Sequence, residues 1–137
     1  MSTRVYLDTS TVVKLFIAER ETSDLQQWLA DLSKPHLVSS ALLAVELLRL
    51  LRLINPAIVT PAEQFLAADI DIVEITPPVL GDATTVPPLR LRTLDAIHLA
   101  TALDLGASID VLLTYDMLLI EAARAAGLTV AFPGASY

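Results

Sequence analysis

Val5-Tyr6-Leu7-Asp8-Thr9-Ser10 joins an apolar run to a carboxylate and a pair of hydroxyls. Apolar residues followed directly by capping residues are typical of a buried strand that leads into a helix, and Thr9 and Ser10 offer the cap. The run Val111-Leu112-Leu113 is followed in a similar way by Asp116. Both carboxylates are therefore expected at the carboxyl end of a strand, the edge of an open α/β sheet where ligands bind.

The rest of the chain alternates between strand and helix patterns. Strands are expected at residues 4–7, 36–39, 71–75, 111–114 and 129–132, and helices at residues 11–18, 21–32, 40–53, 61–68, 93–105 and 116–126. Proline pairs at 77–78 and 87–88 bracket a segment with room only for a short helix. Strands that alternate with helices pair in parallel through right-handed crossovers. We therefore expect an α/β fold, a three-layer α/β/α sandwich around a central parallel sheet of about five strands.

Composition limits the class of protein. The chain has 137 residues, of which 54% are hydrophobic and 5% aromatic, so its core must be built mainly from Leu, Ala, Val and Ile. The absence of cysteine, with two histidines in unrelated surroundings, argues against a zinc site. No uncharged apolar run reaches the roughly 18 residues of a membrane span, and the first residues lack a signal-peptide pattern. We expect a soluble, cytoplasmic protein without membrane contact.

The charge balance is acidic, with 16 Asp and Glu against 9 Lys and Arg and a net charge of −7. Such a balance argues against a broad basic surface for nucleic acid. Several of the cations are nevertheless paired, Arg49 with Arg52 and Arg90 with Arg92. Because a bound cation would also offset part of the negative charge, net charge alone does not decide the partner.

Two further acids lie on helices that leave the same edge. Asp95 falls in the first turn of its helix, where the macrodipole favours an anion, and Glu46 must reach inward from the second turn of its own. Two carboxylates about 5 Å apart repel by roughly 3 kcal/mol at an effective dielectric constant near ~20. A cluster of Asp8, Glu46, Asp95 and Asp116 therefore favours a hard, oxygen-preferring cation, Mg²⁺ with Mn²⁺ as a substitute.

Four blocks of sequence carry a resemblance to a known family. They are residues 5–10, residues 45–49 (Val-Glu-Leu-Leu-Arg), residues 94–102 (Leu-Asp-Ala-Ile-His-Leu-Ala-Thr-Ala) and residues 113–116 (Leu-Thr-Tyr-Asp) with Ala122-Ala123 and Gly127-Leu128. In this order they resemble a PIN domain, and most closely the VapC-type toxins of toxin–antitoxin pairs. The resemblance extends from Arg4 to about Ala131, and we expect residues 1–137 to form a single PIN-like domain.

The resemblance implies a magnesium-dependent endoribonuclease that acts on structured RNA and is silenced by a cognate antitoxin. It implies metal ligation, directly or through water, by Asp8, Glu46, Asp95 and Asp116. It also implies that Ser10 or Thr114 orients a carboxylate or a water, and that the products carry a 5′-phosphate and a 3′-hydroxyl. The chain departs from many relatives at Leu118, where they carry an arginine, so that arginine's contacts are not carried over.

Arg92, Glu46 and His98 each have two interpretations, one functional and one structural. Arg92, just before the helix with Asp95, could contact a substrate phosphate or remain solvated. Glu46 could form an ordinary ion pair with Arg49, worth about 0.2–0.5 kcal/mol, which is compatible with metal binding. His98 could act as a general base, but its apolar neighbours favour a packed, structural histidine, and we leave it outside the site.

Other classes of protein remain as alternatives. Asp8 and Asp116 taken singly could be mere helix caps. A phospho-accepting receiver domain also combines clustered acids with Mg²⁺, but it needs a late lysine, and the only lysines are Lys14 and Lys34. A non-catalytic PIN-like protein-binding module is the stronger alternative, although the four acids are intact.

The helix expected at residues 40–53 is apolar on nearly every side. A single core covers only one stripe of a helix. The excess apolar surface predicts a second contact, and we expect both a homodimer and an antitoxin partner.

Overall fold

The computed structural model describes residues 2–137 and contains one parallel sheet within that range. Its strands are β1 (Arg4–Leu7), β2 (His36–Ser40), β3 (Asp71–Val73), β4 (Val111–Leu113) and β5 (Val130–Ala131). They lie in the order β3-β2-β1-β4-β5, so β1 and β4 are central neighbours although most of the chain separates them. The carboxyl ends of all strands therefore meet at one edge of the sheet.

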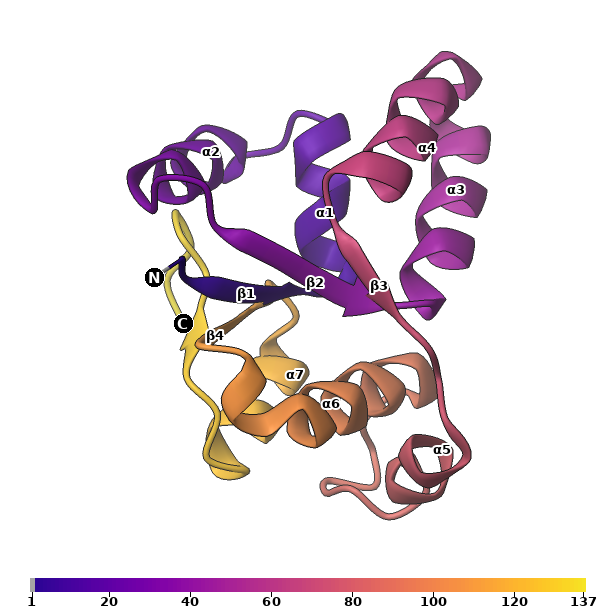
Figure 1. Ribbon diagram of the computed structural model, residues 1–137, viewed down its shortest axis with the longest axis vertical. Helices are drawn as coiled ribbons and strands as arrows, with labels where there is room; N and C mark the ends of the chain where they lie inside the picture. Colours follow the sequence, from indigo (N-terminus) through magenta and orange to yellow (C-terminus); the bar gives the residue numbers. More distant parts are fainter. Residues whose placement is uncertain (1) are drawn as a thin grey trace.

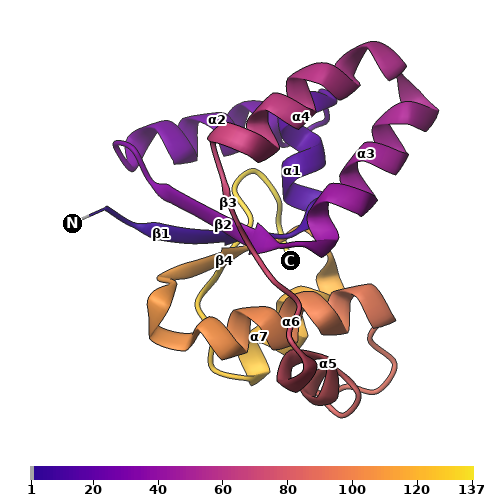
Figure 2. The ribbon, with the colours of Figure 1, turned by 45° about the vertical axis from the view of Figure 1, so that its right-hand side comes forward.

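Helices cover both faces of this sheet, as Figure 1 and the rotated view in Figure 2 show. On one face lie α1 (Thr9–Phe16), α2 (Thr22–Asp31), α3 (Leu42–Ile54) and α4 (Val59–Ala68). On the other face lie α5 (Pro77–Ala83), α6 (Thr93–Leu105) and α7 (Met117–Ala125). The expected three-layer α/β/α sandwich with five parallel strands is confirmed for the described residues.

The core is divided into two layers by the alternation of side chains along the central strands. Val5 and Leu7 pack with the α1–α4 layer, whereas Tyr6 between them packs with the α6–α7 layer. Leu112 joins Tyr6 on that second side. Because successive strand residues point to opposite faces, a short apolar run such as 5–7 supplies both layers at once.

Helix starts differ from expectation at α1. Asp8, rather than Thr9 or Ser10, is the N-cap, because its carboxylate accepts the Thr11 backbone N–H at 3.1 Å. The helix therefore begins at Thr9. At α3 the cap residue is Ala41, although the Ser40 hydroxyl accepts the Leu42 N–H at 3.1 Å.

The outer strands are shorter than expected. β3 pairs only with β2, and its register ends at Ser40 opposite Val73 because the chain turns into α3 directly after β2. β5 pairs with β4 only at Leu112 and Leu113. Each outer strand thus ends opposite the last residue of its single neighbour, which the local pattern could not reveal. Within residues 2–137, no helix has the length and apolar character to cross a membrane.

Candidate functional site

The pairing of β1 with β4 places Asp8 and Asp116 at the same edge. Leu7 lies opposite Leu113 in the register, and the Asp8 N–H donates to the Leu113 carbonyl at 3.3 Å. Asp8 then caps α1 and Asp116 caps α7, where its Oδ1 accepts the Leu119 N–H at 2.9 Å. Each carboxylate therefore sits at a helix N-terminus, where the macrodipole stabilises a negative charge.

Asp8 is the most buried of the four predicted acids, with 2% of its surface exposed. Ser10 Oγ donates to its Oδ1 at 2.8 Å, Thr11 Oγ1 at 3.0 Å, and Thr114 Oγ1 to its Oδ2 at 2.6 Å. Burial raises the pKa of the Asp8 carboxyl above its ordinary value, although these hydrogen bonds oppose the shift. Ser10 and Thr114 thus orient the Asp8 carboxylate, and Thr114 Oγ1 also accepts the Asp116 N–H at 3.2 Å.

Asp95 projects toward the same acids from the first turn of α6. Its pKa is raised from 3.8 to about 6, first by burial and then by the negative charges of Asp116 and Asp8. Asp116 and Asp8 thus lie within electrostatic reach of Asp95, and Arg92 contacts both Asp95 and Asp116. Perturbation by burial together with like charges is characteristic of functional sites.

Arg92 lies on the rim of this acid cluster. Its Nη2 is 3.4 Å from Asp116 Oδ2 and its Nε is 4.0 Å from Asp95 Oδ2. The Arg92 side chain is 78% exposed, so these ion pairs are screened by water and weak. The guanidinium is therefore free to exchange these carboxylates for an incoming anion.

Glu46 on α3 contacts neutral and basic side chains rather than the other acids. Thr9 Oγ1 donates to Glu46 Oε1 at 2.6 Å, and His98 Nε2 lies 2.9 Å from the same oxygen. Burial favours a higher pKa of the Glu46 carboxyl, but the hydrogen bonds from His98 and Thr9 outweigh it and keep the pKa below its ordinary value. Glu46 is thus ionised and pairs with His98 instead of Arg49, which corrects the ion pair considered from the sequence.

His98 was correctly predicted to be buried, since only 1% of it is exposed, and the structure adds a contact with the predicted site residue Glu46. Its ring bridges Glu46 and the Tyr6 hydroxyl, which lies 2.7 Å from Nδ1. The one available signal was its spacing from Asp95, because residues three apart on a helix share a face. Its pairing with a residue 52 positions away could not be read from a local pattern.

The donor set fits a divalent cation in its chemistry, although it is not assembled as a cage. Among residues 2–137, no group of three or more acidic or histidine side chains stands ready to hold a metal ion. Asp8, Asp95 and Asp116 nevertheless offer carboxylate oxygens at one edge, and the raised pKa of Asp95 marks charge that a cation would neutralise. Carboxylates without thiolates suit Mg²⁺ or Mn²⁺.

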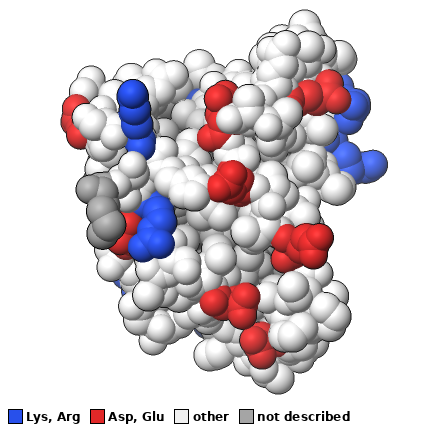
Figure 3. All heavy atoms as spheres, viewed as in Figure 1, with Lys and Arg blue, Asp and Glu red and all other residues white. Residues whose placement is uncertain are grey.

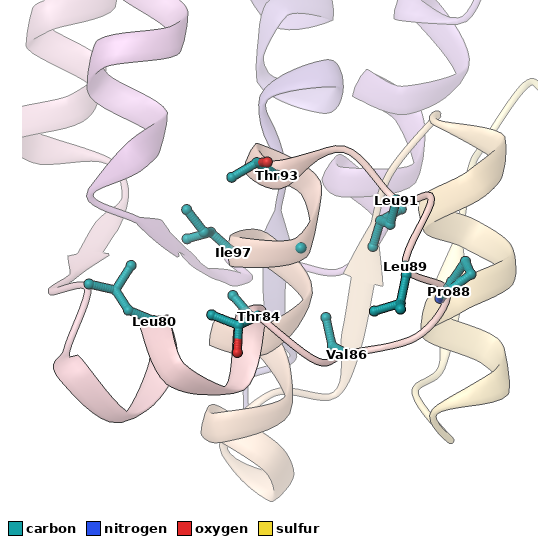
Figure 4. A pocket seen from close by; sticks show the side chains of 10 residues that line it. Leu80, Thr84, Val86, Pro88, Leu89, Leu91, Thr93 and Ile97 are labelled. Carbon is teal, nitrogen blue, oxygen red and sulfur yellow. The ribbon is translucent and has the colours of Figure 1, made fainter.

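A separate hollow of about 470 Å³ lies between α5, the following loop and α6, as Figure 4 shows. Its wall is formed by uncharged side chains: Leu80, Ala83, Thr84, Val86, Pro88, Leu89, Leu91, Thr93, Ala96 and Ile97. Thr93 and Ala96 flank Asp95 in the sequence, but Asp95 itself does not line the hollow. The hollow is thus a different surface from the acid cluster.

Comparison with known proteins finds a matching family and full-length relatives. The PIN domain family matches residues 5–125. Ribonuclease VapC47 of Mycobacterium tuberculosis is 38% identical over 96% of this chain and 98% of its own. Ribonuclease VapC35 of the same species is 42% identical over 95% of this chain and 97% of its own.

Solved structures show the same fold at lower identity. VapC20 of Mycobacterium tuberculosis, a Sarcin-Ricin loop cleaving toxin, has a TM-score of 0.72 and 18% identity over 94% of this chain and 99% of its own. VapBC2 of Rickettsia felis, bound to a fragment of its promoter DNA, has a TM-score of 0.71 and 13% identity over 96% of this chain and 99% of its own. From the family match and the full-length relatives, we conclude that the chain belongs to the PIN domain family and is homologous to proteins named Ribonuclease VapC.

Proposed function

We propose that this protein is a divalent-metal-dependent endoribonuclease, the toxin of a toxin–antitoxin pair, built as a single PIN domain and acting in the cytoplasm. The observation that carries the proposal is the gathering of three acids at the carboxyl edge of the sheet: Thr114 contacts both Asp8 and Asp116, and Arg92 contacts both Asp116 and Asp95. Relatives named Ribonuclease VapC at 38% and 42% identity support the same activity. A purely structural cluster of like charges would be destabilising without a function to maintain it.

In this proposal Asp8, Glu46, Asp95 and Asp116 hold Mg²⁺, or Mn²⁺ in its place. The ion would supply an activated water and neutralise charge that builds on the scissile phosphate. Ser10 and Thr114 keep the Asp8 carboxylate in one orientation, so that little reorganisation is needed during the reaction. Arg92, exposed beside Asp95 and Asp116, would contact a phosphate of the RNA.

The charge distribution makes RNA binding dependent on the metal. The face drawn in Figure 3 carries scattered acidic side chains and, among the described residues on it, no continuous basic patch. With a net charge of −7 the metal-free protein repels a polyanion. A cation bound among the acids reverses that repulsion where the phosphate must lie.

The test is cleavage of a panel of structured RNAs by the purified protein, with Mg²⁺, with Mn²⁺ and with a chelator. We expect internal cuts only when metal is present, with products that carry a 5′-phosphate and a 3′-hydroxyl. In the same assay Arg92→Gln should raise KM more than it lowers kcat, because it removes a contact made before the chemical step. No cleavage of any RNA under any metal condition would favour a non-catalytic, protein-binding PIN domain.

We further propose that an apolar surface on α3 and its end is covered by a second copy and by a cognate antitoxin. Val45 is 60% exposed, Leu53 is 83% exposed and Ile54 is 52% exposed. Structures with the same fold include FitAB of Neisseria gonorrhoeae and VapBC2 of Rickettsia felis, both bound to DNA.

For this surface we expect sedimentation of the purified chain to show a dimer, and Leu53→Glu to shift it toward monomer. Co-expression with the neighbouring gene of the native operon should yield a stable complex. Circular dichroism should show that the Leu53→Glu monomer is still folded, because Leu53 packs little within the chain. A monodisperse monomer that captures no operon partner would contradict the proposal.

A further inference from the structure

A buried hydrogen-bonded chain connects the two helical layers past the end of the sheet. It begins at Tyr6 on β1, whose hydroxyl lies 2.7 Å from His98 Nδ1 on α6. The ring of His98 stands nearly perpendicular to that of Tyr6, at 81°. His98 Nε2 then reaches Glu46 Oε1 on α3 at 2.9 Å, and Thr9 Oγ1 reaches the same oxygen at 2.6 Å.

The pattern of partners assigns the proton on the imidazole. A tyrosine hydroxyl is protonated at neutral pH and is the natural donor to Nδ1. Nε2 must then carry the ring proton, which it donates to the Glu46 carboxylate. The hydrogen bond made by one ring nitrogen of a histidine commonly determines whether the other nitrogen carries the proton.

Both hydrogen bonds end on one oxygen of Glu46. Within residues 2–137, Thr9 and His98 bond to Oε1, and Oε2 accepts no hydrogen bond. The Glu46 side chain retains 19% exposure, so its second oxygen is not sealed in the core. A glutamate in the second turn of a helix would otherwise sample many rotamers, and losing that freedom when a metal binds would weaken its affinity for the metal.

We infer that His98, fixed by Tyr6, is a positioning residue that holds one oxygen of Glu46 and presents the other to the divalent cation of the site. The inference rests on the proposed function, since Glu46 is a ligand only if the acids bind metal. Asp8 and Asp116, by contrast, accept backbone N–H groups at helix N-termini, and Asp8 also accepts hydroxyls.

The test compares three replacements of His98 by direct metal binding, with Mn²⁺ followed by electron paramagnetic resonance and Mg²⁺ by calorimetry. A glutamine amide reaches the position of Nε2 and can still donate to Glu46, whereas an asparagine amide reaches only the position of Nδ1. His98→Asn and His98→Leu should weaken metal binding by about 10- to 100-fold, the usual effect of removing a partner of a metal ligand. His98→Gln should retain most of the metal affinity. The metal affinity of Tyr6→Phe should lie between that of His98→Gln and that of His98→Leu.

A double-mutant cycle shows whether His98 acts through Glu46. Glu46→Gln alone should weaken metal binding, and His98→Leu should add nothing in that background. The matched control is the other histidine, His36, which pairs with Asp71 at the amino end of the strands; His36→Leu should leave metal affinity unchanged. Thermal unfolding with a chelator would confirm that each variant is folded.

The outcomes separate this inference from the proposed function. If the wild-type chain binds metal and Glu46→Gln weakens it, but His98→Leu and His98→Asn bind like wild type, the inference is wrong and the nuclease proposal stands. Additive losses in the cycle, or equal losses for Gln and Leu at position 98, would likewise overturn it in favour of a packing role. If the wild-type chain binds no metal, both proposals fall.

Discussion

Asp8→Asn should reduce metal-dependent RNA cleavage by about 10²- to 10³-fold, the effect of removing a preorganised electrostatic group from an active site. Asp8 is buried at the junction of β1 and α1 and receives three side-chain hydroxyls. An amide keeps the shape and can still cap the helix, but it brings no negative charge. Expression of the variant should also relieve any growth arrest that the wild-type chain causes.

The fold of the Asp8→Asn variant can be checked independently of its activity. Because burial already disfavours the Asp8 charge, the amide should leave the metal-free protein folded, as measured by thermal unfolding. Asp104→Asn is the matched control, since Asp104 is an exposed acid near the far end of α6, and its activity should equal wild type. Equal cleavage or equal toxicity of wild type and Asp8→Asn would point to a binding module instead.

The sequence allowed the strand-to-helix junctions to be placed because they depend on neighbours in the chain. An apolar run followed by an acid predicts both a strand and a cap, and Asp8 and Asp116 fulfil both roles. Once the strands are parallel, topology alone brings such residues to one edge. This is why Asp8 and Asp116 could be placed at the same edge before their contacts were known.

What the local pattern could not supply is pairing between distant segments. β3 and β5 end opposite the last residues of β2 and β4, and nothing within residues 71–75 or 129–132 records where those neighbours end. The link between Glu46 and His98 joins helices from opposite layers. Glu46 has a nearby Arg49 that looks like a partner in the sequence, yet its carboxylate contacts His98 on α6 instead.

Asp95→Asn should stabilise the metal-free protein while it removes activity. The pKa of Asp95 is raised from 3.8 to about 6 in the folded chain by burial and by Asp116 and Asp8, so ionising it opposes folding. A tenfold change in proton affinity corresponds to about 1.4 kcal/mol, so the full penalty is at most about 3 kcal/mol. Stability from this group is fully present below pH 3.8 and is lost as the pH rises through about 6.

Urea unfolding in a chelator at several pH values measures this effect. The advantage of Asp95→Asn over wild type should be small near pH 4, grow up to about pH 6 and then remain level. Glu121→Gln, an exposed carboxylate-to-amide change on α7, should show no such rise. An advantage of Asp95→Asn that is independent of pH would contradict the shared acid site.

In millimolar Mg²⁺ the wild-type chain should become more stable to unfolding than Asp95→Asn. A ligand that binds only the folded state stabilises it in proportion to the logarithm of its concentration over the dissociation constant. In the wild-type chain the negative charge of Asp95 repels Asp116 and Asp8 but attracts a cation. Asp95→Asn lacks that charge and should therefore bind Mg²⁺ more weakly. The charge that destabilises the metal-free protein therefore strengthens its binding of Mg²⁺. If Mg²⁺ stabilised the wild type and Asp95→Asn equally, Asp95 would lie outside the metal site.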